Sequence, residues 1–175
     1  MKSNENIDAV WSRLVSRATR VALMRQDTGY AQLAEALKEL GVSESPRSIE
    51  GKIQRGTFRF SFFLQAAVAA NTDIPRVWKD ALHSAESWER RAAAVLEAEL
   101  AQQPWVRYDR LAARLDEIGI VIPAAALEAQ ICDGSFPASL FFQCATVCRF
   151  ESVERFVDSS SLQEAALRGA GQAPL

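Results

Sequence analysis

The chain contains one pattern of residues twice, at an offset of 77 to 78 residues. The segment that begins at Tyr30, YAQLAEALKELGVSESPRSIEGKIQRGTFRFSFFLQA, aligns without a gap on the segment that begins at Tyr108, YDRLAARLDEIGIVIPAAALEAQICDGSFPASLFFQC. Thirteen of the 37 aligned positions are identical. Repetition at a fixed spacing indicates that one structural unit has been duplicated. The unit covers roughly residues 7–79 and again residues 84–158.

Hydrophobic periodicity predicts that the first unit begins with two helices. Apolar residues recur with a period near 3.6 over residues 7–22, which predicts a long amphipathic helix that extends to about residue 28. A second helix is predicted over residues 30–40. It is followed by Gly41, where a left-handed C-terminal cap favours glycine.

Three more helices are predicted in the same unit. Ser45 and Pro46 supply an N-cap and a first-turn proline for a third helix that runs to Arg55. Residues 60–70 form a fourth that is apolar on nearly all sides, as is typical of a helix at the centre of a bundle. A fifth begins at Pro75, and because neither Gly nor Pro occurs in the next 28 residues, we expect it to continue with little break into the second unit.

The expected architecture is all-α, with two tandem helical bundles. The first domain is predicted to cover residues 1–79 and the second residues 80–158. Residues 159–175 are expected to form a C-terminal tail, in which a capping-box-like stretch from Ser161 to Glu164 precedes a loose end.

Composition favours a globular protein of the cytoplasm. The 175 residues are 49% hydrophobic and 24% charged, which is ordinary for a packed domain. No basic start leads into an apolar stretch, and no run approaches the roughly 18 apolar residues of a membrane span. The three cysteines, Cys132, Cys144 and Cys148, are an odd number in a chain without secretory features, so we interpret them as core thiols.

Charge divides unequally between the two units. The whole chain has a net charge of -2. Residues 1–79 carry 12 Lys and Arg against 8 Asp and Glu, a net charge of +4, whereas residues 80–175 carry 8 against 14, a net charge of -6. Such an asymmetry indicates that one half interacts with a polyanion, although an ordinary solvated surface produces it too.

The residues of the first unit resemble two known kinds of domain. The succession YAQLAEALKELGV, SPRSIEGKIQRG and an apolar fourth helix resembles the lambda-repressor/Cro (Xre-type) helix-turn-helix domain of bacterial regulators. The pattern Y..LA..L...G followed by I..KI.RG.F...FFLQ is similar to an uncharacterised bacterial domain family. The second unit departs from KI.RG, because it has QICDG at this place. The first resemblance implies two helix-turn-helix bundles and a DNA-binding transcriptional regulator.

The third helix is the expected DNA-reading element of the first unit. Ile49 and Ile53 point inward, and the opposite side is polar and basic, as a helix in the major groove requires. Gln32, near the start of the second helix, is a candidate phosphate contact by the helix-turn-helix resemblance. The full set of candidate DNA-binding residues is Gln32, Arg47, Ser48, Gly51, Lys52, Gln54, Arg55 and Arg59.

The corresponding side of the second unit has no positive charge, which favours packing over phosphate binding. We expect it to be buried, either against the first unit or against a second copy of the chain in a homodimer. A homodimer would restore a second basic helix about one DNA turn away. The candidate interface residues are Ala125, Ala126, Ala129 and Cys132.

Other functions are weighed against this interpretation. Enzymatic activity is disfavoured because there is no glycine-rich phosphate loop and His83 is the only histidine. No cofactor or small-molecule substrate is evident, and three thiols without a fourth ligand do not indicate a metal site. The clustered phenylalanines are interpreted as core rather than as a stacking platform for single strands. The alternative function is a non-catalytic protein-interaction module, antitoxin-like or an adaptor, whose basic side meets an acidic partner.

Overall fold

The computed structural model describes residues 2–83 and 87–171 and confirms the all-α prediction. The first repeat consists of α1 (Lys2–Arg25), α2 (Tyr30–Glu39), α3 (Pro46–Arg55), α4 (Phe60–Ala69) and α5 (Arg76–His83). Its helix ends follow the predicted signals. The Ser45 hydroxyl accepts a hydrogen bond from the Ser48 N–H at the start of α3, and Gly41 and Gly56 have φ angles of 83° and 66°.

The second repeat reproduces these boundaries. It consists of α6 (Trp88–Ala101), α7 (Tyr108–Glu117), α8 (Ala124–Asp133), α9 (Ala138–Cys148) and the 3-10 helix η1 (Glu151–Arg155). The starts of α7, α8 and α9 each lie 78 residues after those of α2, α3 and α4, as the difference between Tyr30 and Tyr108 shows. The tandem duplication inferred from the sequence is thus a duplication of structure.

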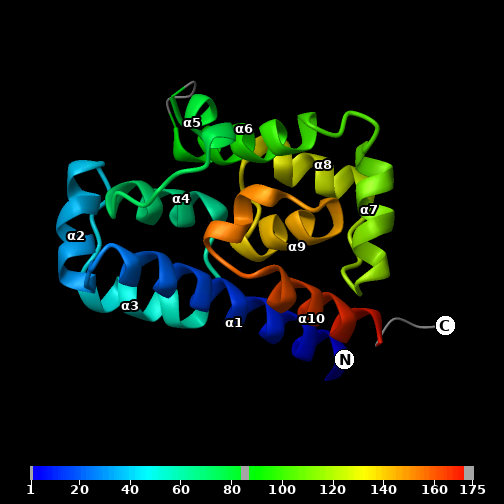
Figure 1. The fold of residues 1–175 in the computed structure, drawn as a ribbon, viewed down its shortest axis with the longest axis horizontal. Helices are drawn as coiled ribbons and strands as arrows, with labels where there is room; N and C mark the ends of the chain where they lie inside the picture. Colours follow the sequence, from blue (N-terminus) through cyan, green and yellow to red (C-terminus); the bar gives the residue numbers. More distant parts are fainter. Residues whose placement is uncertain (1, 84–86, 172–175) are drawn as a thin grey trace.

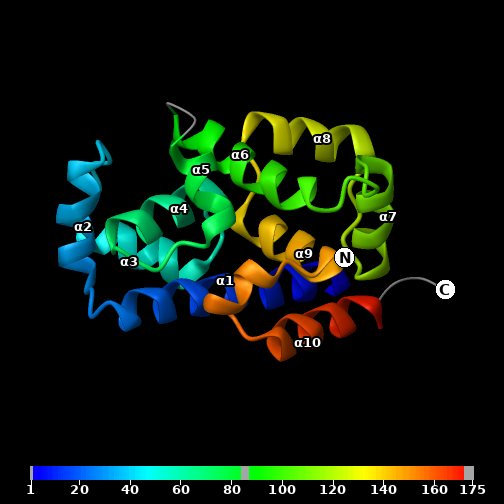
Figure 2. The same cartoon turned by 45° about the horizontal axis from the view of Figure 1, so that its top comes forward.

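Each repeat completes the core of the other. Helix α4 of the first repeat packs against α6 of the second, and α9 of the second packs against α1 of the first. The helices α2 and α7 lie at opposite ends of the molecule, with α3 and α8 at opposite corners (Figures 1 and 2). A single hydrophobic core runs through both repeats.

A pseudo-twofold relation connects the repeats where α4 and α9 begin. The Phe60 N–H donates to the Phe136 carbonyl at 3.1 Å, and the Ala138 N–H donates to the Phe58 carbonyl at 3.0 Å. The two hydrogen bonds exchange when 78 is added to or subtracted from each number. They flank the antiparallel bridge between Arg59 and its own counterpart, Pro137. The axis of the internal pseudo-dimer therefore passes near this bridge.

Aromatic contacts obey the same relation. Trp78 lies edge-on to Phe141 with ring centroids 5.4 Å apart, and the counterpart pair Phe156 and Phe63 is edge-on at 5.3 Å. Trp78 and Phe156, which occupy equivalent positions, stack on each other at 5.5 Å. The clustered aromatic side chains are core, as predicted.

The packing of α3 on α1 is close in both repeats. A Cβ atom built on Gly56 would overlap the carbonyl oxygen of Ser12 in α1, and one built on Gly134 would overlap that of Glu89 in α6. Both glycines are also in the left-handed region. No residue with a side chain fits at either position without displacing a helix.

The structure corrects two expectations about the helices. The fifth helix does not continue into the second repeat: α5 ends at His83, and the separate helix α6, N-capped by Ser87, packs against it. Residues 84–86, between them, lie outside the described residues.

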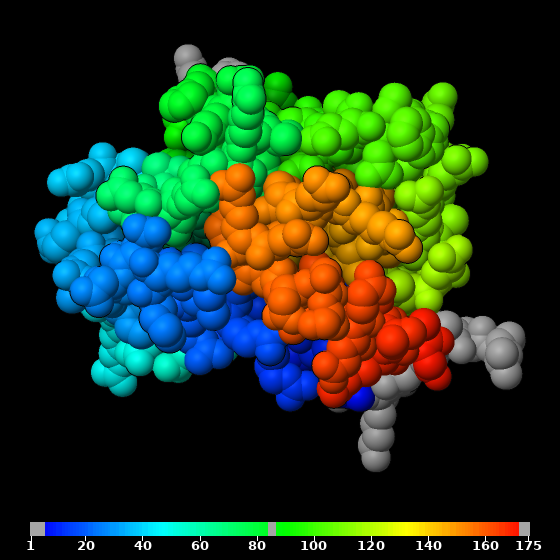
Figure 3. All heavy atoms as spheres, in the orientation of Figure 1, coloured from blue at the N-terminus to red at the C-terminus, as the bar shows by residue number. Residues whose placement is uncertain are grey.

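The expected C-terminal tail begins as an ordered helix, α10 (Ser159–Ala170), which packs on α1 and α9. Figure 3 shows α1, η1 and α10 on one face of the molecule. The N-cap is Asp158, whose carboxylate accepts from the Ser161 N–H at 3.1 Å. The helix buries Leu162, Ala165, Ala166 and Gly169, an apolar face that repeat-based reasoning did not consider. Residues 172–175 lie outside the described part of the chain.

None of the helices in residues 2–83 and 87–171 combines the length and the apolar character needed to cross a membrane.

Candidate nucleic-acid interface

Helix α3 presents a polar face to solvent. Ile49 and Ile53 are completely buried, so the helix is fixed on the core by one side. On the outer side Arg47, Ser48, Gln54 and Arg55 are exposed, and Gly51 and Lys52 are half-buried. The predicted recognition face is therefore accessible along the length of the helix.

Glu44, which the sequence analysis did not consider, ties down part of this face. Its carboxylate forms an ion pair with the Lys52 ammonium at 2.6 Å and accepts a hydrogen bond from the Ser48 hydroxyl at 3.2 Å. The Lys52 ammonium also lies 4.9 Å from the centre of the Phe62 ring. Ser48 and Lys52 are thus committed to the protein, which leaves them less available to phosphate than was expected. The spacing of four residues from Glu44 to Ser48 was the signal available in the sequence.

Arg47 and Arg55 remain free of ion pairs among the described residues. A Cβ built on Gly51 would lie 3.1 Å from the Arg55 Nη1 atom, so this glycine makes room for the guanidinium to lie across the helix. Its role is therefore to accommodate Arg55, in addition to any close approach of DNA. Gln54 donates from Nε2 to the Glu50 carboxylate at 3.2 Å, which leaves its carbonyl oxygen exposed.

Two further candidates lie away from the centre of α3. Gln32 is exposed, and its Oε1 atom accepts the Gly29 N–H at 2.8 Å, so its amide group caps α2 while its NH2 faces solvent. Arg59 is exposed at the bridge between the repeats. Hydrogen bonds from Ser135 lower the pKa of Asp133, and the positive charge of Arg59 lowers it further. Arg59 is therefore partly balanced by the second repeat.

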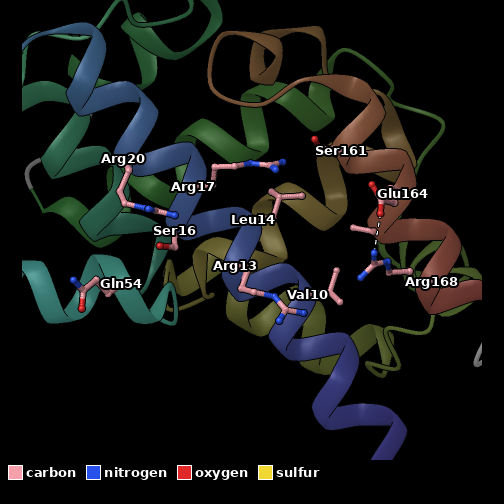
Figure 4. Close-up of a pocket in the computed structure, with 11 residues that line it drawn as sticks. Val10, Arg13, Leu14, Ser16, Arg17, Arg20, Gln54, Ser161, Glu164 and Arg168 are labelled. Atoms are coloured by element: carbon pink, nitrogen blue, oxygen red, sulfur yellow. Dashed lines mark hydrogen bonds and ion pairs between the residues drawn. The ribbon is translucent and has the colours of Figure 1, made fainter.

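The structure also reveals a row of arginines that the sequence analysis missed. Arg13, Arg17 and Arg20 project from successive turns of α1 into a cleft of about 520 Å³ (Figure 4). Gln54 of α3 forms one side of the cleft, and Ser161, Glu164 and Arg168 of α10 form the other. The spacing i, i+4, i+7 places the three guanidinium groups on one helix face, a signal visible in the sequence.

The alanine side of α8 is exposed in the single chain. Ala125, Ala126, Ala129 and Cys132 all lie on the surface, so the expectation that the first repeat buries them is wrong. The reason is that α8 lies at a corner of the molecule, and the repeats meet instead through α4 and α9. Cys132 is consequently not a core thiol, unlike the buried Cys144 and Cys148.

A neighbouring side chain partly covers Cys132. Its sulfur lies 3.9 Å from the Tyr108 hydroxyl. Burial raises the pKa of Tyr108 to about 12, and the Cys132 contact adds to the effect. The phenol is therefore neutral, and α8 offers no charged group at the position where α3 carries Gln54.

The connection between α2 and α3 is longer than a minimal helix-turn-helix. Six residues, from Leu40 to Ser45, separate the two helices, whereas a turn of three or four is usual. The resemblance to helix-turn-helix domains therefore rests on the order and exposure of the helices.

Comparison with known proteins assigns the family. Searches against curated proteins and against solved structures found no significant match. A search against protein families matches residues 11–74 and again residues 88–153 to one family, described as a domain of unknown function (DUF6471). The two matches follow the two repeats and together cover more than half of the chain. The chain therefore belongs to the DUF6471 family and contains its domain twice.

Proposed function

We propose that the protein is a DNA-binding transcriptional regulator that contacts double-stranded DNA through α3 of its first repeat. The observation that supports this most is the contrast between two equivalent helices. On the same scaffold, α3 exposes Arg47 and Arg55, whereas α8 exposes Ala125 and Asp133 at the same positions. A merely solvated face has no reason to be basic in one copy and free of positive charge in the other.

The free groups of α3 suit both kinds of DNA contact. An arginine guanidinium binds a phosphate or, with two hydrogen bonds, the edge of a guanine. Arg47 lies in the first turn of α3 and Arg55 at its last residue, so the two can reach phosphates on either side of a groove. Gln54 between them on the exposed side can accept a hydrogen bond from a base.

Replacement of Arg55 with aspartate, the residue of the second repeat, should weaken binding to double-stranded DNA by about 1–3 kcal/mol. The change removes one cation and places an anion next to phosphate. The slope of log K against log salt concentration should also become shallower by about one. Both quantities are measured by fluorescence anisotropy with a labelled duplex over a series of salt concentrations.

The matched control is Arg110→Asp, which makes the same charge change at an exposed position of α7. It should leave the affinity close to that of the parent protein. Equal affinities for the parent and Arg55→Asp would contradict the proposed role of α3. Equal losses for both variants would mean that only the total charge matters.

We propose further that α8 associates with a second copy of the chain, and the exposure of its apolar face supports this. Ala125, Ala126 and Ala129 give that face a low profile, which allows helices to approach closely. The neighbouring Val121 is 77% exposed. A homodimer would also supply a second basic α3, and paired reading helices increase DNA affinity.

Ala129→Arg should convert such a dimer to a monomer without unfolding the protein, because the side chain is exposed in the single chain. A large charged group at the centre of the contact causes overpacking and buries a charge. Light scattering at several protein concentrations measures the mass. Ala113→Arg, at an exposed position of α7, is the control. A parent protein that is monomeric at every concentration would exclude the dimer and favour the protein-interaction module as the function of this face.

A further inference from the structure

The cleft between α1, α3 and α10 carries a concentration of positive charge that the proposed role of α3 does not use. Four arginines line it, and Glu164 is its one carboxylate. That carboxylate is neutralised within α10 by an ion pair with Arg168 at 2.8 Å. Arg13, Arg17 and Arg20 form no ion pair with any residue in the described part of the chain. Their charges are therefore available to a ligand.

We propose that Arg13, Arg17 and Arg20 form a phosphate-binding track for the backbone of the same DNA duplex that α3 contacts. The inference rests on the proposed function and extends the binding surface to a second helix. The track is joined to α3 directly, because Gln54 of α3 and the three arginines line one cleft. A duplex placed against α3 brings one strand over this cleft.

The spacing of the arginines suits a phosphate backbone. From Arg13 to Arg20 the helix rises by about 10 Å, at roughly 1.5 Å for each residue. One DNA strand advances about 3.4 Å along the duplex axis for each phosphate, so the track spans about three phosphates. Guanidinium groups bind phosphate oxygens with paired hydrogen bonds, which suits a row of exposed arginines.

The second repeat again provides the internal comparison. At the offset that aligns Trp11 with Trp88, Arg13 corresponds to Arg90, Arg17 to Ala94 and Arg20 to Glu97. One arginine is kept, one is lost and one is replaced by a carboxylate. Helix α6 has thus lost its positive row in the same repeat in which α8 has lost its own. Two helices that differ in sequence and in register have lost their positive face together, which is expected if both had served one ligand.

The cleft is walled by α10, whose position limits what can enter. Ser161 and Arg168 belong to that wall, and α10 packs on α1 through its buried alanines. The opening is polar, and Val10 and Leu14 contribute only part of its lining. An extended polyanion that crosses the mouth of the cleft fits this arrangement.

The test uses the full chain with Arg13, Arg17 and Arg20 all replaced by glutamine, which keeps length and helix propensity. The probe is a fluorescein-labelled duplex of about 20 base pairs, in salt from about 50 to 200 mM. At the lowest salt concentration the affinity should fall on the order of 100-fold, and the salt slope should become shallower by about 2 to 3. The loss should be the same for duplexes of different sequence, because phosphate contacts carry no sequence information.

The control triple variant replaces Arg90, Arg107 and Arg110 with glutamine, which removes the same charge from exposed positions of the second repeat. It should bind like the parent protein, and circular dichroism should show that both variants are folded. If the parent binds and Arg55→Asp is weakened but the α1 variant is not, the track is overturned while the role of α3 stands. If the parent binds no duplex even at the lowest salt concentration, the proposed function itself falls. Equal losses in both triple variants would also overturn the track.

Discussion

Replacement of Phe60 with alanine should lower the free energy of unfolding by about 3–5 kcal/mol, as is usual for a fully buried phenylalanine. The ring belongs to the first repeat but stacks on Phe141 of the second, with centroids 4.0 Å apart. It also contacts Phe136 and Trp78. Its loss opens a cavity where both halves of the core meet, so the whole molecule should be destabilised at once.

Chemical denaturation followed by circular dichroism measures this effect. The parent and Phe60→Ala should each unfold in one transition, because each repeat completes the core of the other. The control is Trp105→Ala, which removes a larger ring that is 59% exposed and should change stability by about 0.5 kcal/mol or less. Two separate transitions, with only the first moved by Phe60→Ala, would show two independent domains and contradict the shared core.

Gly56→Ala should destabilise the protein by about 3 kcal/mol or more. The left-handed backbone contributes roughly 1–2 kcal/mol of this loss, and the overlap of the new methyl group with the Ser12 carbonyl contributes about 1–3 kcal/mol. The neighbouring backbone cannot move away easily, because Ser12 lies inside the long helix α1. The damage should extend to the position of α3.

Gly41→Ala separates the two contributions. Gly41 also has a positive φ, of 83°, but a Cβ there would meet nothing within 4 Å. Its replacement should cost about 1 kcal/mol, the backbone contribution alone. Thermal unfolding of both variants gives the comparison. If the two variants are equally stable, the close packing of α3 on α1 is not a constraint.

Local features of the fold were predictable from the sequence because they depend on neighbouring residues. The starts of α2 and α3 follow from apolar periodicity and from Ser45 and Pro46, and their ends follow from Gly41 and Gly56. The repeat then transfers these boundaries to the second half. Such signals act over one or two turns of helix, and a single sequence displays them completely.

The arrangement of the repeats was not predictable in the same way. Nothing in the pattern of α4 says whether it packs on the first helix of its own repeat or on that of the other, since an apolar helix suits both. The break between α5 and α6 and the docking of α10 depend on surfaces that form only when both repeats are assembled. For this reason a tail was expected where the chain forms an ordered helix.

The candidate site was predictable in outline and incomplete in detail. The wheel of α3 identified Arg47 and Arg55 as outward, and both are exposed. It could not show that Glu44, just outside the helix, holds Lys52. The row on α1 carries a clear helical spacing, but its relation to α3 appears only when the two helices lie side by side.

The internal pseudo-twofold has a consequence for how such a surface can evolve. In a homodimer built from two identical chains, every substitution appears in both halves, so no surface can be kept in one and discarded in the other. Here both halves are encoded separately while they still share one core. Arg55 and Asp133 could therefore diverge independently at equivalent positions. Covalent linkage has released the surface from symmetry, while the interlocked packing keeps the interior bound to it.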